Sequence, residues 1–201
     1  MPIQGALAAS LYNIELLAFE YPDTSQERWP AHIADSDSAN QRQIQGELHA
    51  TGTTAPGIRM LSRKKLAAMS KVLNKQGLPV VAHMRWQQRI AGRNNNRWYQ
   101  IDEGPLQGVI HLERGRFLHF TADLTLQHAG QTYPIPMQRR FKSGEIHYLD
   151  HPKIGILLRA DRVYTKTTSR PTQPVKAPEP TAPAQPTTPK TDRPSALPDL
   201  S

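Results

Sequence analysis

The sequence contains no cysteine and no long apolar run. Without thiols the chain forms no disulfide and performs no thiolate chemistry, and an oxidising compartment is neither required nor excluded. Because no apolar run approaches the roughly 20 residues that cross a bilayer, we expect no transmembrane segment. Aromatic residues make up only 6% of the chain, and all of them lie before residue 165. The part of the chain that can build a core therefore ends near this point.

The C-terminal segment 166–201 is rich in Thr, Ala, Gln and Lys and holds nine of the 18 prolines. Such a segment cannot bury enough apolar surface to offset the entropy lost on ordering, so we expect a disordered Pro/Thr-rich tail. At the other end, "ALAAS" (Ala6–Ser10) resembles the small-residue cleavage region of a secretory signal peptide. The charged and apolar segments that should precede it are missing. We therefore expect 1–10 to be a residual leader, a start codon upstream of Met1, and a single domain over 11–165.

The pattern in the first half predicts a strand followed by a helix. Leu11–Tyr21 is apolar on both alternating faces, which is typical of a central strand covered on both sides. Residues 23–57 carry no clear period, and we expect a long loop there. Ser62 is a good N-cap and Gly77 stands where a left-handed C-cap belongs. The sequence thus predicts one long amphipathic helix between them, with Leu66, Met69 and Leu73 on its buried side.

Strand patterns continue over 78–88, 106–114, 116–127, 133–141 and 153–163. The first of these follows the helix and suggests a βαβ-type unit. Gly115 joins the next two as a hairpin, and one face of the later strand carries Leu118, Phe120, Ala122, Leu124 and Leu126. We expect an α+β domain: a mostly antiparallel sheet, one long amphipathic helix packed on one face, and the other face partly wet.

The stretch "SGEIHYLDHPKIG" (143–155) gathers two histidines and two carboxylates. His147 and His151 have a spacing that suits two metal ligands on a helix, with a third from His111 or His119. However, Pro152 favours extended geometry at the residue before it, so a helix is not expected and we predict no metal site and no cofactor.

Two other interpretations of this stretch remain. Glu145, His147 and Asp150 are chemically suited to the acid–base work of a hydrolase, but no nucleophile elbow, phosphate loop or paired-carboxylate signature accompanies them. The alternative is a structural turn formed by Asp150, His151, Pro152 and Gly155, in which Asp150 accepts local backbone N–H groups. We favour the turn and predict no catalytic residue.

The formal net charge of +8 predicts a polyanionic partner, such as nucleic acid, acidic lipid or peptidoglycan, without choosing among them. Guanidinium groups suit carboxylates, and Tyr148 or Trp86 could stack on a sugar ring. Scattered charges that only keep the protein in solution are the alternative. The candidate ligand-binding residues are Arg116, His119, Arg139, Arg140, His147 and Tyr148.

Three segments taken together, "YNIELLAFEYP", "PLQGVIHLERGRFLHFTADL" and "RRFKSGEIHYLDHPKIGILLR", resemble the CsiV family of periplasmic peptidoglycan-binding proteins. The similarity runs from about Tyr12 to Val163. The resemblance implies a non-enzymatic adaptor protein of cell-wall biogenesis and cell shape. It also implies partners: peptidoglycan, the outer-membrane lipoprotein activator LpoA and a class A penicillin-binding protein. No ligand residue can be carried over from the family.

A basic nucleic-acid-binding domain is the rival that the charge suggests. The sequence shows no helix-turn-helix, RNP-type aromatic motif or zinc finger, and its basic residues are interspersed with acids. We therefore expect no nucleic-acid partner.

Overall fold

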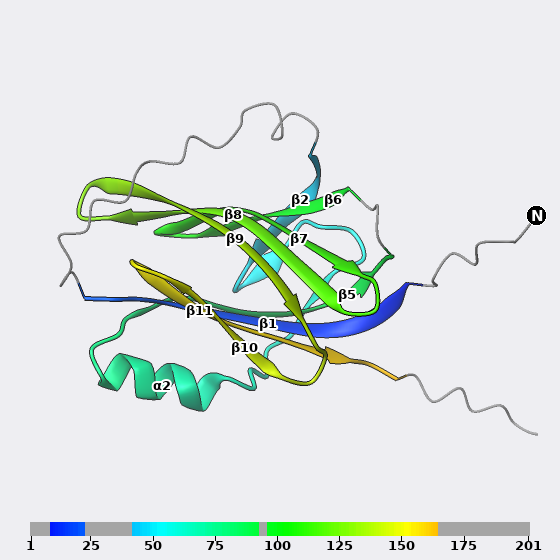
Figure 1. Ribbon diagram of the computed structural model, residues 1–201, viewed down its shortest axis with the longest axis horizontal. Helices are drawn as coiled ribbons and strands as arrows, with labels where there is room; N and C mark the ends of the chain where they lie inside the picture. Colours follow the sequence, from blue (N-terminus) through cyan, green and yellow to red (C-terminus); the bar gives the residue numbers. More distant parts are fainter. Residues whose placement is uncertain (1–8, 23–41, 93–95, 165–201) are drawn as a thin grey trace, which may run out of the picture. The chain divides into compact units, whose positions relative to one another are not determined.

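Two β-sheets face each other in the part of the chain that the structure describes, and helix α2 lies on the outer side of the smaller sheet (Figure 1). The structure is a computed structural model, and it describes residues 9–22, 42–92 and 96–164. The elements are β1 (Ser10–Glu20), β2 (Gln43–His49), β3 (Gly52–Thr53), β4 (Arg59–Met60), α2 (Ala67–Lys75), β5 (Val80–Ile90), β6 (Arg97–Glu103), β7 (Leu106–Arg114), β8 (Leu118–His128), β9 (Gln131–Phe141), β10 (Ile146–His151) and β11 (Ile154–Arg162).

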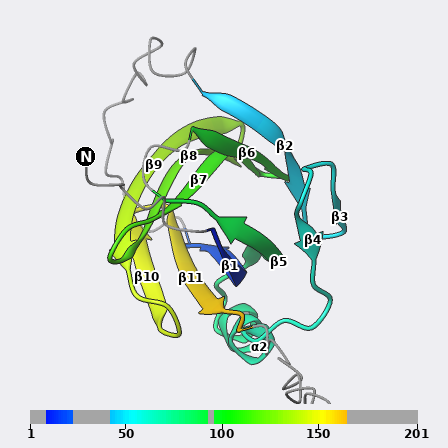
Figure 2. The same cartoon turned by 90° about the vertical axis from the view of Figure 1, so that its right-hand side faces the viewer.

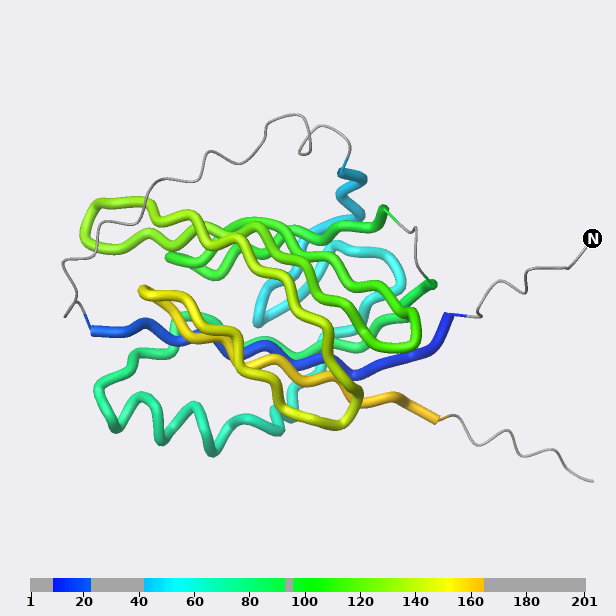
Figure 3. The backbone as a smooth tube through the Cα atoms, viewed as in Figure 1, coloured from blue at the N-terminus to red at the C-terminus, as the bar shows by residue number. Residues whose placement is uncertain are grey.

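The five-stranded sheet has the order β10-β11-β1-β5-β4, and the six-stranded sheet has the order β3-β2-β6-β7-β8-β9. Strands β6 to β9 form an antiparallel meander, which the tube in Figure 3 follows without interruption. After β9 the chain crosses to the other sheet, where the β10–β11 hairpin returns against β1. The first strand therefore lies at the centre of its sheet, paired antiparallel with β11 and β5.

The main core fills the space between the sheets, which curve around it (Figure 2). Alternate residues of β1, from Tyr12 to Ala18, face this core, whereas Leu17 and Phe19 face α2 in a second apolar cluster. The prediction of a central strand covered on both sides is confirmed. The predicted alternation in β8 is confirmed as well, because all five residues of its apolar face are buried.

The predicted fold class is wrong. The described residues form a mostly β structure, and α2 is a short helix of nine residues rather than a long amphipathic one. Ser62 does not cap this helix. The N-cap residue is Leu66, whose side chain forms no hydrogen bond with the first turn. Met69 is 42% exposed instead of buried. A second sheet, not a helix, covers the inner face of the five-stranded sheet.

Contacts with β5 explain why the helix starts late. Leu61 N–H donates to the Arg85 carbonyl, the Lys64 ammonium donates to the His83 carbonyl, and the Arg85 guanidinium donates to the Arg63 carbonyl. Segment 61–66 is therefore held along β5 and cannot wind into a helical turn. The predicted C-terminal end is confirmed: Gly77 has φ +80°.

The hydrogen bonds Gly77 N–H to the Asn74 carbonyl and Leu78 N–H to the Leu73 carbonyl complete a Schellman motif at this end.

Two further expectations are wrong. Strands β1 and β5 flank α2 in the chain but pair antiparallel, so the segment is not a parallel βαβ unit. Part of the expected 23–57 loop is strand, since β2 and β3 lie in it and β2 pairs parallel with β6. Residues 23–41 lie outside the described residues. So do 1–8 of the predicted leader and the whole predicted tail, 166–201.

Candidate functional site

Three of the predicted ligand residues meet around Phe117, on the outer face of the six-stranded sheet. His119 of β8 lies directly opposite Arg140 of β9. The guanidinium carbons of Arg140 and Arg116 lie 4.9 Å and 5.7 Å from the centroid of the Phe117 ring. Nε2 of His119 is buried and has no hydrogen-bond partner among the described residues. We call Arg116, Phe117, His119 and Arg140 the Phe117 group.

The other predicted ligand residues lie elsewhere. Arg139 is opposite Phe120, so strand alternation turns it away from Arg140. His147 and Tyr148 belong to β10 in the five-stranded sheet. Trp86 is fully buried, and its indole N–H donates to a neighbouring glutamine, so it cannot stack on a sugar.

The residues considered for metal binding and for hydrolysis do not converge. His147 and His151 are four residues apart on an extended strand, which separates them by about 13 Å. Within residues 9–22, 42–92 and 96–164, no three His, Asp or Glu side chains gather in a way that could hold a metal ion. Nε2 of His147 lies 3.6 Å from Glu145. Asp150 is three positions further along the strand and points to the opposite face.

The predicted turn residues lie at the β10–β11 hairpin. Asp150 and His151 end β10, and the turn itself consists of Pro152 and Lys153. Nδ1 of His151 accepts the Lys153 N–H at 3.4 Å, and burial lowers the pKa of His151 below its ordinary value of 6.5. The carboxylate of Asp150 accepts hydrogen bonds from two tyrosine hydroxyls, those of Tyr21 and Tyr148.

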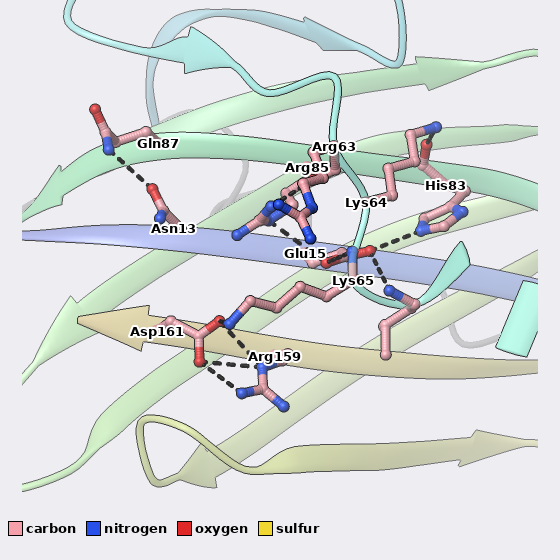
Figure 4. A network of polar contacts seen from close by, with 11 residues as sticks. Asn13, Glu15, Arg63, Lys64, Lys65, His83, Arg85, Gln87, Arg159 and Asp161 are labelled. Carbon is pink, nitrogen blue, oxygen red and sulfur yellow. Dashed lines mark hydrogen bonds and ion pairs between the residues drawn. The ribbon is translucent and has the colours of Figure 1, made fainter. Parts of the chain in front are cut away.

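A buried carboxylate, Glu15, organises the outer face of the five-stranded sheet (Figure 4). It is 1% exposed and accepts hydrogen bonds from Lys65 N–H at 2.9 Å, Leu66 N–H at 2.8 Å and His83 Nε2 at 2.9 Å. Arg85 Nε lies 3.5 Å away. The carboxylate thus satisfies the backbone at the start of α2, which the helix's own cap residue does not do.

The pKa of Glu15 results from opposing effects. Burial by itself raises it, but the hydrogen bonds from His83 and from the Leu66 and Lys65 backbone outweigh burial and leave the pKa below 4.5. The group is therefore ionised at neutral pH.

A second carboxylate, Asp161 of β11, joins the same face. Arg159 donates from Nε and Nη2 to Asp161 at 2.9–3.0 Å, and Lys65 Nζ donates to it at 2.9 Å. Burial raises the pKa of Asp161, but these hydrogen bonds dominate and lower it from 3.8. Lys65 therefore links the segment before α2 to β11 through its side chain, and to β1 through its backbone.

Cations outnumber carboxylates on this face. Strand register aligns Arg59 with Gln87, Gln87 with Asn13, and Arg85 and Arg159 with Glu15. These aligned residues, together with the segment before α2, form a surface that we call the basic strip. It consists of Arg59, Arg63, Lys65, Arg85, Arg89 and Arg159, with Glu15 and Asp161 as its carboxylates.

The sequence analysis missed the basic strip because its cations come from four separate segments. The alternation of Arg85, Gln87 and Arg89 with buried neighbours was a signal that β5 has one polar face. Nothing in the sequence indicated that this face would meet Arg159 and Lys65, since that depends on the pairing of β1 with both neighbours.

Comparison with known protein families identifies the family of this chain. A family model described as "Peptidoglycan-binding protein, CsiV" matches residues 1–163. The chain belongs to the CsiV family. The resemblance inferred from the sequence is thereby confirmed. No curated protein and no solved structure matches the chain.

Membership of the CsiV family implies peptidoglycan binding, and hence a place in the periplasm. Among the described residues of this CsiV-family chain, no helix has the length and apolar character needed to cross a membrane. Peptidoglycan offers two kinds of chemistry to such a protein: amino-sugar rings in its glycan strands, and carboxylates in its peptide stems. The basic strip is suited to the carboxylates.

Proposed function

We propose that this chain is a non-enzymatic peptidoglycan-binding protein and that its basic strip binds the carboxylates of the peptide stems. The observation that carries the proposal is the excess of cations over carboxylates on one sheet face of a CsiV-family protein. A planar guanidinium binds a carboxylate through two parallel hydrogen bonds, so an arginine-rich strip suits a polymer that presents such groups repeatedly.

Within the strip, the exposed members are those able to contact a ligand. Arg63 and Arg89 are exposed and form no side-chain ion pair with any described residue. Lys65 and Arg159 are committed to Asp161, and Arg85 is buried beside Glu15. These three therefore fix the strip in place, while Arg63, Arg89 and Arg59 present their charges to the ligand. The fixed residues therefore define the position of the strip, and the exposed ones supply charge that is not neutralised by a neighbouring carboxylate of the described residues.

The Phe117 group is a second candidate contact on the other sheet. Its two guanidinium groups lie against one ring, so they are partly oriented for a ligand. However, Glu113 of β7 lies opposite His119, which lowers the local excess of positive charge. His147 and Arg139, also predicted as ligand residues, face away from both surfaces. We place the main carboxylate contact on the basic strip for this reason.

Binding to purified sacculi tests the proposal. In a pelleting assay at low ionic strength, the wild-type protein should co-sediment with sacculi, and added salt should release it, because contacts between exposed charges are screened. The variant Arg63→Glu/Arg89→Glu should bind at least about tenfold more weakly. A matched variant, Lys71→Glu/Lys142→Glu, makes the same charge change at exposed residues outside the strip and should bind nearly as well as wild type.

The outcomes separate the parts of the proposal. Wild-type protein that stays in the supernatant at low salt would overturn peptidoglycan binding itself. If the strip variant pellets like wild type while Arg116→Glu/Arg140→Glu does not, the ligand lies at the Phe117 group instead. Tight retention of DNA in a filter-binding titration, with no pelleting, would favour the nucleic-acid alternative. Release of soluble fragments from sacculi by the protein would contradict a non-enzymatic role.

The proposal includes an adaptor role in wall synthesis. The family resemblance supports export to the periplasm, interaction with the lipoprotein activator LpoA, and stimulation of a class A penicillin-binding protein. A reconstituted assay tests it: glycan polymerisation by that enzyme and its activator should rise when this protein is added. No change in rate, together with no co-precipitation of the activator, would restrict the function to wall binding.

A further inference from the structure

We propose that the outer face of β10 carries a platform for an amino-sugar ring of the glycan strand. It consists of Phe19, Tyr21, Tyr148 and Asp150, which we call the tyrosine platform. The inference rests on the proposed function and adds a second part of the same ligand to it. Tyr148 is 42% exposed on β10, which is the edge strand of its sheet.

The ring of Tyr148 is held from beneath by aromatic packing. Phe19 lies parallel to it, with ring centroids 6.4 Å apart and planes at 11°, and Tyr21 meets Phe19 edge-on at 5.6 Å. Gly155 leaves room for this arrangement, because an added Cβ would lie within 3.0 Å of three atoms of the Phe19 ring. A flat, rigid and partly exposed ring is the surface on which the C–H groups of a sugar pack with little loss of entropy.

Polar groups border the exposed ring. The hydroxyls of Tyr148 and Tyr21 both donate to Oδ1 of Asp150, at 2.8 Å and 3.0 Å, and the two hydroxyls contact each other. Burial and the neighbouring Asp150 raise the pKa of Tyr21 to about 12, so its phenol stays protonated as a donor. Oδ2 of Asp150 accepts no hydrogen bond from any described residue. An exposed carboxylate oxygen beside a ring suits the hydroxyl and acetamido N–H groups of an amino sugar.

The tyrosine platform lies on the same sheet face as the basic strip. Tyr148 is opposite Leu157, and Ile146 is opposite Arg159. Arg159 is thus two residues along β11 from the platform, a distance of about 7 Å. A glycan strand carries its acidic peptides directly on its sugars. The ligand that fits the platform and the neighbouring strip is therefore a peptidoglycan strand, with one sugar on the platform and its peptide carboxylates at the strip.

A neutral probe isolates the platform from the strip. The probe is an oligomer of β-1,4-linked N-acetylglucosamine, which has the sugar chemistry of the glycan and no carboxylate. In ¹H–¹⁵N NMR titrations of the full chain, we expect shifts at Tyr148, Asp150 and Gly155. Tyr148→Ala should weaken binding about tenfold, whereas Tyr148→Phe, which keeps the ring, should stay within about threefold of wild type. Asp150→Asn should also weaken binding.

The matched control is Tyr164→Ala, which removes another exposed tyrosine, 77% exposed and stacked by Arg162 instead of Phe19. It should bind the oligomer like wild type, as should Arg63→Glu/Arg89→Glu. If Tyr148→Ala binds the oligomer like wild type, the platform is refuted. If wild type ignores the oligomer but still pellets with sacculi, the platform is refuted and the proposed function stands. If Tyr148→Ala fails to fold, Asp150→Asn decides, and unchanged binding of the oligomer by that variant refutes the platform.

Discussion

Replacing Glu15 by glutamine is expected to destabilise the fold by about 2–4 kcal/mol, although the two side chains have nearly the same shape. Glu15 is almost fully buried and ties β1 to the start of α2. The substitution removes the charge and turns one acceptor oxygen into a donor. Everything that faces Glu15 in the structure is a donor, so the amide group must oppose one of them.

The magnitude follows from the contacts. Leu66 N–H and His83 Nε2 both reach Oε1, while Lys65 N–H reaches Oε2. If the glutamine carbonyl takes the place of Oε1, its NH₂ group meets Lys65 N–H and the Arg85 guanidinium. One buried N–H is then left unpaired, at about 1–3 kcal/mol, and the two remaining bonds lose the strength that the charge gave them, about 0.5 kcal/mol each.

Thermal unfolding followed by circular dichroism at pH 7 measures the effect. For a domain of this size, the expected loss corresponds to a fall in Tm of about 5–15 °C. The control is Glu145→Gln, whose side chain is 57% exposed and whose contact with His147 is long, at 3.6 Å. We expect it to change stability by less than about 0.5 kcal/mol. Equal Tm values for the two variants would refute the role given to Glu15.

The pH dependence supplies an independent check. Because the pKa of Glu15 in the folded state lies below 4.5, its stabilising contribution is complete above that pH and is lost as the pH falls through the folded-state pKa. The stability of Glu15→Gln should therefore approach that of wild type in acid. A constant difference between the two proteins from pH 7 to pH 3 would contradict the sign of this shift.

Two further outcomes test the packing and the titration of the same sheet. Gly155→Ala should lower the free energy of unfolding by about 1–3 kcal/mol, because its Cβ meets the Phe19 ring. Gly52→Ala is the control: nothing lies within 4 Å of the added atom, so urea unfolding should show a much smaller loss. Equal losses would contradict the steric account. Burial lowers the pKa of His151 in the folded state, so the contribution of its neutral ring to folding stability is complete above pH 6.5 and is lost as the pH falls through the folded-state pKa. His151→Gln should therefore flatten the decline in Tm between pH 6.5 and 5. An unchanged slope would refute this assignment.

Local patterns in the sequence predicted the strands well. The strict alternation in β8 and the hairpin at Gly115 depend on neighbours in the chain, and both hold in the structure. The two-sided apolar pattern of β1 likewise indicated that both of its faces are covered. The pattern did not indicate which element covers each face, because a sheet and a helix both provide an apolar surface. In the structure a sheet covers one face and a short helix covers the other.

The helix start and the functional surface could not be predicted, and the reason is the same for both. Ser62 is a good N-cap by residue type, yet the group that satisfies the backbone there is Glu15, about 50 residues earlier in the chain. Similarly, the basic strip exists only because β1 brings β5 and β11 to either side of one carboxylate. Arg116, His119, Arg139 and Arg140 were expected to share one face of neighbouring strands, but strand alternation turns Arg139 away from Arg140.

The joint presence of the strip and the platform on one sheet face explains how a surface of weak contacts can hold a polymer. An exposed cation gains at most about 1 kcal/mol from one carboxylate, and a stacked ring about as much from one sugar. Either contact alone gives only weak binding. Because the basic strip and the tyrosine platform lie on the same face of one rigid sheet, a peptidoglycan strand bound at one is held at high effective concentration for the other. We therefore expect isolated sugars and isolated stem peptides to bind weakly, and intact sacculi to bind far more tightly than either.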